Sequence, residues 1–419
     1  MGPQVKIFLL IFSAISLLAT PAMAKGSTEK SRVELLAAEG ITLMRITAIH
    51  GKRFSYIKAL EQFAASVDQE SEGRIKVELL LGGEAGSEAE ALKKQIRRKL
   101  EGGLTSATTL AHSLPAFRLL TLPLLFTAPS HVENFINSPL DLNIRDTASK
   151  KNLKVLGYGS YGFYGLLAFD PDTENREINI TDSTTPEEVE ASLLQNMIAE
   201  HNQPARSFTE LSVRAPTDLW MSRIHKALSI KQVTVPAADL KDAIESGWVN
   251  GIISTPETLA NTSYPATASH YFDIRQQHGW SVFTVNKIWF NRLPSDLKQI
   301  IQEAVTATSQ VMQQTAFQHG FNTREAWASA GWPEIVVSEA AELEAAFRPL
   351  AFRSARKLER TLGMPHAIRD LWNKNRTPQS NSWPTSTNHS GGISATGVEV
   401  NELIMRDTLK EKMRRVPRQ

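Results

Sequence analysis

The stretch RIKVELLLGGEAGSEAE, residues 74–90, predicts a strand, a tight turn and the start of a helix in direct succession. Residues 74–81 are rich in side chains that favour strands, and the glycine pair at 82–83 ends them. Ser87 has the side chain of a helix N-cap, and the acidic residues after it complement the positive end of a helix. We therefore expect a helix over 87–100.

Strands and helices alternate on both sides of this stretch. Before it, residues 41–48 alternate well enough for a strand, and 51–70 predict a helix. After it, 104–108 and 152–158 are further candidate strands, and the apolar residues 114–126 indicate a buried crossing segment. Strands that alternate with helices form mainly parallel sheets with helices on both faces, so we expect ligands beyond the carboxyl ends of the strands.

A second unit repeats this alternation. It is expected to hold strands at 211–214, 232–235 and 249–254 and helices at 216–228 and 237–246. A helix over 294–327 follows, and its regularly spaced apolar positions indicate one buried face. A helix of this length is able to bridge two lobes. The patterns predict an α/β fold with mixed sheets in two lobes, bridged by a long helix.

Composition excludes several functional classes. The 419 residues carry 46 Lys and Arg against 44 Asp and Glu, so the chain lacks the excess positive charge that binds nucleic acid. There is no cysteine, which excludes disulfides, thiolate zinc sites, iron–sulfur clusters and cysteine nucleophiles. No two of the histidines have the helical spacing of a metal site. We expect neither a metal nor a cofactor.

The first 24 residues predict a secretory signal peptide. Lys6 precedes an apolar run over 7–19, and small residues before Lys25 form a cleavage pattern that ends at Ala24. The run is shorter than the roughly 20 residues that a membrane-spanning helix needs, which disfavours the alternative of an uncleaved anchor. We expect cleavage after Ala24 and a mature protein in a bacterial periplasm.

Six short motifs follow one another along the chain. They are SEGRIKV (71–77), GEAGSEAE (83–90), LTLPLLF (120–126), LSVRAP (211–216), AIESGWVNG (243–251) and VNKIWFNRLP (285–294). In this order they resemble the periplasmic solute-binding subunits of tripartite ATP-independent (TRAP) transporters of the C4-dicarboxylate, DctP-like type. Each motif alone has low specificity, but their shared order covers the chain from residue 41 to about residue 371.

The resemblance implies a two-lobed periplasmic-binding-protein fold that closes on a small organic acid and delivers it to the membrane permease subunits of a TRAP transporter. Arg214 occupies what looks like the carboxylate-binding position of the family, and it is also the last residue of a predicted strand. A planar guanidinium replaces the lost hydration of a carboxylate with two parallel hydrogen bonds. The alternative is a surface arginine paired with an acid.

This chain departs from the family pattern around the expected pocket. Tyr164 stands where many members carry a second basic residue, and residues 250–256 lack the usual amide and carboxylate. We therefore expect a monocarboxylate with an apolar or aromatic body rather than a C4 diacid. The expected ligand-binding residues are Arg214, Tyr164, Tyr161, Ser106, Phe163, Trp220 and Ser254, with Trp248 as a further neighbour. The alternative for the aromatic residues is ordinary core packing.

The expected division of the chain leaves two segments outside the lobes. The polar residues 170–204 are interpreted as an insertion, either a surface loop or part of the pocket rim or of a docking face for the permease. The Ser-, Thr- and Gly-rich tail, with a basic amphipathic helix at 398–415, either is a frayed end or contacts a membrane or partner. The expected parts are lobes at 25–165 and 205–290, the bridging helix with C-terminal helices returning to the first lobe at 291–372, and a disordered tail at 373–419.

An enzymatic function has little support in the sequence. It contains no nucleophile elbow, paired-histidine metal motif or phosphate-binding loop. A ligand-binding component that signals to a sensor remains an alternative to a transport receptor. The sequence leaves the ligand, its affinity, the partner permease and the oligomeric state open.

Overall fold

The computed structural model describes most of the chain between Leu36 and Asn375. The residues outside the description are 1–35, 170–210, 217, 228–229, 237–238, 332, 337 and 376–419. The predicted signal peptide, the polar insertion and nearly all of the predicted tail therefore lie outside the described residues. Helix α14 (Ala367–Lys374) extends past 373, the position where the tail was expected to start. No described helix is long and apolar enough to cross a membrane.

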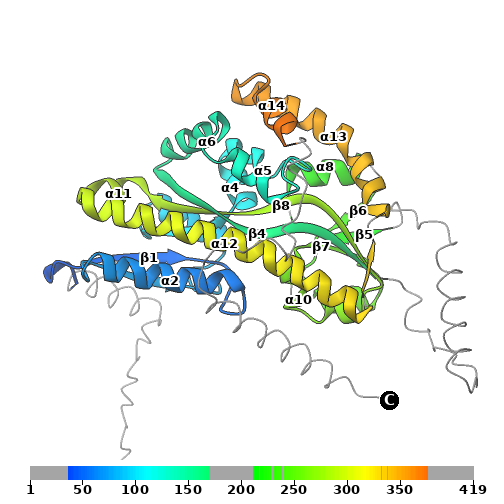
Figure 1. Cartoon of the computed structure of the whole chain (residues 1–419), viewed down its shortest axis with the longest axis horizontal. Coiled ribbons are helices and arrows are strands. Elements are labelled where there is room, and N and C mark those ends of the chain that lie inside the picture. The colour runs from blue at the N-terminus through cyan, green and yellow to red at the C-terminus, as the bar shows by residue number, and fades with distance from the viewer. Residues whose placement is uncertain are drawn as a thin grey trace, which may run out of the picture.

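One nine-stranded sheet forms the centre of the described structure (Figure 1). Its strand order is β2-β1-β3-β8-β4-β7-β5-β6, and β9 pairs with β8. The strands are β1 (Thr42–Thr47), β2 (Ile75–Leu80), β3 (Gly102–Ser106), β4 (Leu153–Ala168), β5 (Ser212–Arg214), β6 (Lys231–Val233), β7 (Gly251–Ser254), β8 (His270–Asn286) and β9 (Glu334–Val336).

The two long strands divide this sheet into two halves. The first half-sheet holds the parallel strands β1, β2 and β3 together with the start of β4 and the end of β8. The second half-sheet holds the parallel strands β5, β6 and β7 together with the end of β4 and the start of β8. β4 and β8 are antiparallel to each other and run through both halves. The predicted two-lobed α/β fold is confirmed, with the lobes joined in one continuous sheet.

Helices cover both faces of the sheet, as the alternating pattern predicts. Figure 1 shows α12 along β4 and β8, with α4, α5 and α6 on the other side. The helices are α2 (Ser55–Glu70), α3 (Glu88–Ile96), α4 (Ala107–Ser113), α5 (Pro129–Phe135), α6 (Pro139–Ser149), α8 (Leu219–Ala227), α9 (Leu240–Glu245), α10 (Pro256–Ala260), α11 (Lys287–Arg292), α12 (Ser295–Ala330), α13 (Ser338–Leu362) and α14, with 3-10 turns η1 (Pro115–Leu119) and η4 (Tyr264–Ala266).

The predicted long helix is α12, and its 36 residues extend about 54 Å at 1.5 Å per residue. It packs on α2 and on β4, and farther along on α10 and β9. One buried face of α12 carries Leu297, Ile301 and Val305 against the first half, whereas Trp327 packs in the core of the second. The helix therefore contacts both halves, as expected for a bridge.

The stretch at 74–90 folds as its sequence predicts. Ser87 caps α3 through a reciprocal capping box, in which its hydroxyl accepts from the Glu90 backbone N–H at 3.3 Å. The Glu90 carboxylate in turn accepts from the Ser87 backbone N–H at 2.9 Å. This exchange satisfies two N–H groups that a helix start otherwise leaves unpaired. It fixes the direction in which α3 leaves the end of β2.

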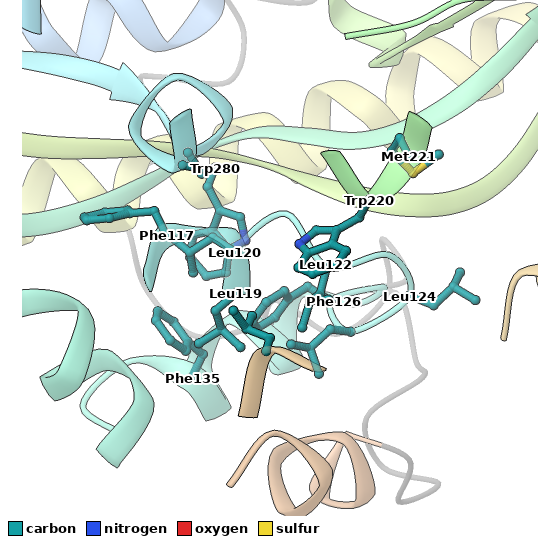
Figure 2. Close-up of a cluster of buried hydrophobic side chains, with 14 of the residues drawn as sticks. Phe117, Leu119, Leu120, Leu122, Leu124, Phe126, Phe135, Trp220, Met221 and Trp280 are labelled. Carbon is teal, nitrogen blue, oxygen red and sulfur yellow. The ribbon is translucent and has the colours of Figure 1, made fainter. Parts of the chain in front are cut away.

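The apolar segment 114–126 is buried, as predicted, in a core that runs through both halves of the molecule. Figure 2 shows Trp220 and Trp280 beside leucines of this segment. Trp280 lies edge-on to Phe126 at a centroid distance of 5.0 Å, and the Trp220 indole Nε1 donates to the Arg118 carbonyl at 3.0 Å. Such packing holds α8 of the second half against a segment of the first.

Candidate functional site

The carboxyl ends of strands from both half-sheets meet at the middle of β4. Ser106, the last residue of β3, pairs with Ser281, which itself pairs with Gly159 of β4. Ser254, the last residue of β7, pairs with Gly165. The β4 residues 160–164 therefore lie between the ends of the first half-sheet and the ends of the second. This is the edge at which parallel sheets bind their ligands.

An irregularity in β4 turns its side chains at this point. The pairing with β8 shifts register between Ser160 and Phe163 and again after Tyr164. Gly162 adopts φ 93°, a left-handed conformation that glycine reaches without strain. The Ser160 hydroxyl accepts from the Gly162 backbone N–H at 2.9 Å and lies 2.7 Å from His278 Nε2. Bulges of this kind redirect side chains next to functional sites.

Tyr56, Tyr161 and Tyr164 form what we call the tyrosine row. The rings of Tyr56 and Tyr161 lie 5.3 Å apart between centroids, and the Tyr56 hydroxyl lies 2.8 Å from His50 Nδ1. The Tyr161 hydroxyl is buried, and although it faces Tyr56 it makes no hydrogen bond of normal geometry with a described residue. Burial, then the negative charge of Glu88, raise the pKa of Tyr56 and Tyr164, with Tyr164 reaching about 12.

Burial also raises the pKa of Tyr161, so the whole row is neutral at physiological pH. Burial lowers the pKa of His50 to about 4, which keeps this ring neutral as well. The row and His50 therefore offer neutral hydrogen-bonding groups and aromatic faces, but no positive charge. A cation has to come from another element.

Arg214 supplies that cation at the carboxyl end of β5. It pairs with Ile252 of β7, the strand whose last residue pairs with Gly165 beside the row, and its positive charge lowers the pKa of Tyr164 against the larger effect of burial. The residue is half-buried, and no described residue forms an ion pair or a side-chain hydrogen bond with it. A partly buried guanidinium without an internal partner is a site for an anion, and its planar fork matches a carboxylate.

The carboxylates around the row are already engaged with protein groups. Glu88 accepts from the Ser106 backbone N–H at 3.0 Å and from the Ser106 and Thr109 hydroxyls at 2.6 Å each. Asp218 caps α8 through the N–H groups of Trp220 and Met221, and burial raises its pKa. The described residues contain no cluster of three or more potential metal ligands.

The structure brings part of the predicted site together. Arg214, Tyr164 and Tyr161 lie along the row, and Ser254 ends β7 beside it. Ser106 also ends its strand there, but its hydroxyl is held by Glu88 and caps α4 through the Thr109 N–H at 3.2 Å. These positions stay predictions for ligand contact.

The remaining predicted residues lie in different surroundings. Phe163 stacks on Phe317 at 5.3 Å in the apolar core. Trp220 is 2 % exposed and packs against the apolar segment of the first half (Figure 2). Trp248, 50 % exposed, precedes the amino end of β7, whereas the strand ends that meet β4 are carboxyl ends. The burial of Phe163 and Trp220 corresponds to core packing, the alternative that the sequence analysis gave for the aromatic residues.

Sequence reasoning missed four residues of this region: His50, Tyr56, Glu88 in its contact role, and Glu257. For two of them the sequence did hold a clue, namely a position just after a strand. His50 shortly follows β1, and Glu257 shortly follows β7. Glu88 was recognised only as an acid of a helix start. Its second role needed the three-dimensional contact with Ser106 and Thr109, which are remote in sequence.

Comparisons with known proteins agree with this architecture. A family model described as "Bacterial extracellular solute-binding protein, family 7" (DctP) matches residues 47–173 and 199–353. A solute-binding protein of Sulfitobacter sp. (strain NAS-14.1) is 20 % identical over 292 residues, which cover 68 % of this chain and 78 % of the relative.

Solved structures share the fold. A TRAP periplasmic solute-binding protein from Ochrobactrum anthropi, with its C-terminus bound in the ligand-binding pocket, has a TM-score of 0.66 at 18 % identity and covers 80 % of this chain and 95 % of its own. A second, from Chromohalobacter salexigens with bound D-glucuronate, has a TM-score of 0.64 at 16 % identity and covers 79 % and 99 %.

Proposed function

The chain belongs to family 7 of the bacterial extracellular solute-binding proteins, the DctP family of TRAP transporter receptors, and we propose that its ligand is an organic acid with a single carboxylate held by Arg214. The expected resemblance is thereby confirmed, and transport rather than signalling is its role. The family consists of solute receptors, and catalysis has no part in the proposed function. The partner is the permease of a TRAP transporter, reached in the periplasm after cleavage at Ala24.

The observation that carries the ligand assignment is the unpaired guanidinium of Arg214. It is half-buried at a strand end, with no ion pair or side-chain hydrogen bond to any described residue. Each hydrogen bond to a charged group contributes about 1.5–3 kcal/mol. A bidentate pair, assisted by the neutral hydroxyl of Tyr164, accounts for most of the roughly 8 kcal/mol of a micromolar complex.

The charges around the tyrosine row favour one carboxylate over two. Arg214 supplies the positive charge, whereas Glu88 and Asp218 add negative charge that acts on Tyr164. A second carboxylate of a C4 diacid would meet acids or neutral tyrosines rather than another cation. The uronic acid in the Chromohalobacter structure, D-glucuronate, also has one carboxylate. The row suits an acid whose remaining atoms are a ring or an apolar body.

Closure of the two halves on the ligand is supported by a contact between them. The Ser55 backbone N–H at the start of α2 donates to Glu257 Oε1 of α10 at 2.6 Å. Contacts that exist only when the halves meet favour the closed state over the open one. A ligand that contacts both halves favours the closed state further. The mechanism we propose is therefore capture by closure, followed by delivery to the permease.

A thermal-shift screen tests the proposal. Protein stripped of ligand by unfolding and refolding is heated with D-glucuronate, D-galacturonate, phenylpyruvate, succinate, malate and neutral glucose. We expect at least one single-carboxylate acid to raise the melting temperature, because a ligand of the folded state stabilises it. Glucose is expected to have no effect. Tight binding of succinate or malate, with no response to any monoacid, would overturn the assignment.

A further inference from the structure

Glu257 is a buried carboxylate that contacts the opposite half of the molecule. It belongs to the first turn of α10 and is 4 % exposed. Its Oε1 accepts a hydrogen bond of 2.6 Å from the backbone N–H of Ser55, the first residue of α2. A buried carboxylate is costly unless hydrogen bonds or opposite charge replace its hydration. Here the partner is the positive end of a helix.

The start of α2 lacks a cap of its own. Its N-cap residue is Phe54, which has no side chain able to accept a hydrogen bond, and its first turn has no acidic residue. A helix of 16 residues leaves unpaired N–H groups and a partial positive charge at this end. Such an end readily binds an anion. Glu257 supplies the anion from the other half.

The start of α2 also lies at the end of the tyrosine row. The negative charge of Glu257 is among the causes, after burial and Glu88, that raise the pKa of Tyr56. Next to Tyr56 lies the Tyr161 hydroxyl, which is unpartnered in a side chain that is only 8 % exposed. The row thus runs from Arg214, which has no anion, to a helix end that already has one. The Tyr161 hydroxyl between them faces Tyr56 without a hydrogen bond of normal geometry.

We propose that Glu257 determines specificity by serving as the internal anion of the site. Among the described residues, Glu257 is the only acid that accepts a hydrogen bond from a helix start in the opposite half. Its negative charge repels a second acidic group on the ligand. The inference rests on the proposed function, because it presumes that Arg214 holds one carboxylate. It assigns to Glu257, in addition to Glu88 and Asp218, a part in the discrimination between single acids and diacids of the same carbon skeleton.

Paired ligands test the inference. Calorimetry measures the Kd of D-galacturonate and of galactarate, which share a six-carbon chain but carry one and two carboxylates, for the wild type and for Glu257→Gln. Gln keeps the size of the side chain and an oxygen that can accept from Ser55, but it removes the charge. We expect the preference for galacturonate over galactarate to fall at least about tenfold in this variant.

Glu359→Gln is the matched control. Glu359 is also a buried acid, 8 % exposed, and it accepts from the Ile368 and Arg369 N–H groups at the start of α14, at 3.0 Å each. It belongs to α13, outside the residues of the site, so its variant is expected to lose stability and to keep the ligand preference. If Glu257→Gln does not fold, Glu257→Ser is measured in its place, and Glu257→Asp, which keeps the charge, is expected to keep the preference.

The outcomes separate this inference from the proposed function. An unchanged preference in folded Glu257→Gln or Glu257→Ser, with galacturonate still bound, overturns the role of Glu257 and leaves the Arg214 assignment in place. Wild-type protein that binds none of the single-carboxylate acids of the screen overturns the proposed function itself. A lower preference in Glu257→Gln together with an unchanged one in Glu359→Gln supports the inference.

Discussion

Tyr161 and Phe163 are two residues apart in one strand, yet they belong to two different buried clusters. Tyr161 faces Tyr56 and His50 and has a hydroxyl without a partner, whereas Phe163 stacks on Phe317 and contacts the ring of His278 at 5.1 Å. The register shift between Ser160 and Phe163 separates them. One short segment thus serves both the site and the core.

This comparison indicates how stability and function are divided. Phe163 belongs to a core that continues through both halves, so its loss should weaken the whole fold. The Tyr161 ring packs in the core of the first half, but its buried hydroxyl makes no hydrogen bond of normal geometry, so we expect the hydroxyl itself to add little to stability. Substitutions at Phe163 should therefore act mainly on unfolding, and substitution of the Tyr161 hydroxyl mainly on binding.

Phe163→Ala should destabilise the empty protein most. Removal of a buried phenyl ring costs about 3–5 kcal/mol, because apolar contacts are lost and a cavity remains beside Phe317. The free energy of unfolding from denaturant titration measures this loss. Phe163→Leu, which keeps most of the volume, should cost less. A decrease in the free energy of unfolding below about 1 kcal/mol for the alanine variant would mean that the packing of Phe163 contributes little to stability.

Acidification should destabilise the protein through His278. Burial lowers the pKa of His278 to about 3 in the folded state, whereas an unfolded histidine has a pKa of about 6.5. Below pH 6.5 the unfolded chain takes up a proton that the folded chain does not, so stability falls as the pH drops, until about pH 3. The expected loss is about 1.4 kcal/mol per pH unit, or about 2 kcal/mol between pH 6.5 and 5.

The comparison of wild type with His278→Gln across this range isolates the contribution. His50 and His131, both with pKa values lowered by burial to about 4, act in the same direction and remain in the variant. The variant should therefore show a shallower dependence of unfolding free energy on pH. Equal slopes for the two proteins between pH 6.5 and 5 would contradict a neutral, buried His278.

Tyr161→Phe should have the smallest effect on folding and a clear effect on binding. Removal of a buried hydroxyl without a partner is neutral or slightly stabilising. Loss of one hydrogen bond to the ligand is expected to weaken binding about tenfold, at the upper end of the usual contribution of about 0.5–1.5 kcal/mol. Denaturant titration and calorimetry measure the two quantities. Unchanged affinity with lower stability would assign Tyr161 to the core.

Much of the fold could be predicted because its signals are local. The capping box at Ser87, the strand-helix alternation and the long apolar face of α12 each depend on residues close in sequence. β8 was missed because polar residues 275–278 interrupt its middle. Residues 276–278 are buried, and Gln277 and His278 contact the apolar segment and β4, which lie far away in the sequence. The full length of β4 was missed because its glycines weaken a strand signal.

The site was predicted less completely for the same reason. Arg214 stood out because it ends a short strand, and the tyrosines because they lie in the glycine-rich exit of a predicted strand. Glu257 and His50 lie a few residues beyond the ends of their strands, which is a weaker mark. The contact of Glu257 with Ser55 joins residues 202 positions apart. Phe163 and Trp220 were aromatic and near the motif, but only the register of β4 and the packing of α8 reveal that they face the core.

The affinity of Arg214→Ala for the best acid from the screen tests the central claim most directly. Calorimetry should show binding at least about a hundredfold weaker than wild type, since two charge-assisted hydrogen bonds of about 1.5–3 kcal/mol each are lost. The melting temperature of the empty protein should stay unchanged, because Arg214 has no described partner to lose. Arg223→Ala, which removes an exposed guanidinium over the Trp220 ring, should bind like the wild type. An Arg214→Ala affinity within about threefold of the wild type would contradict the account.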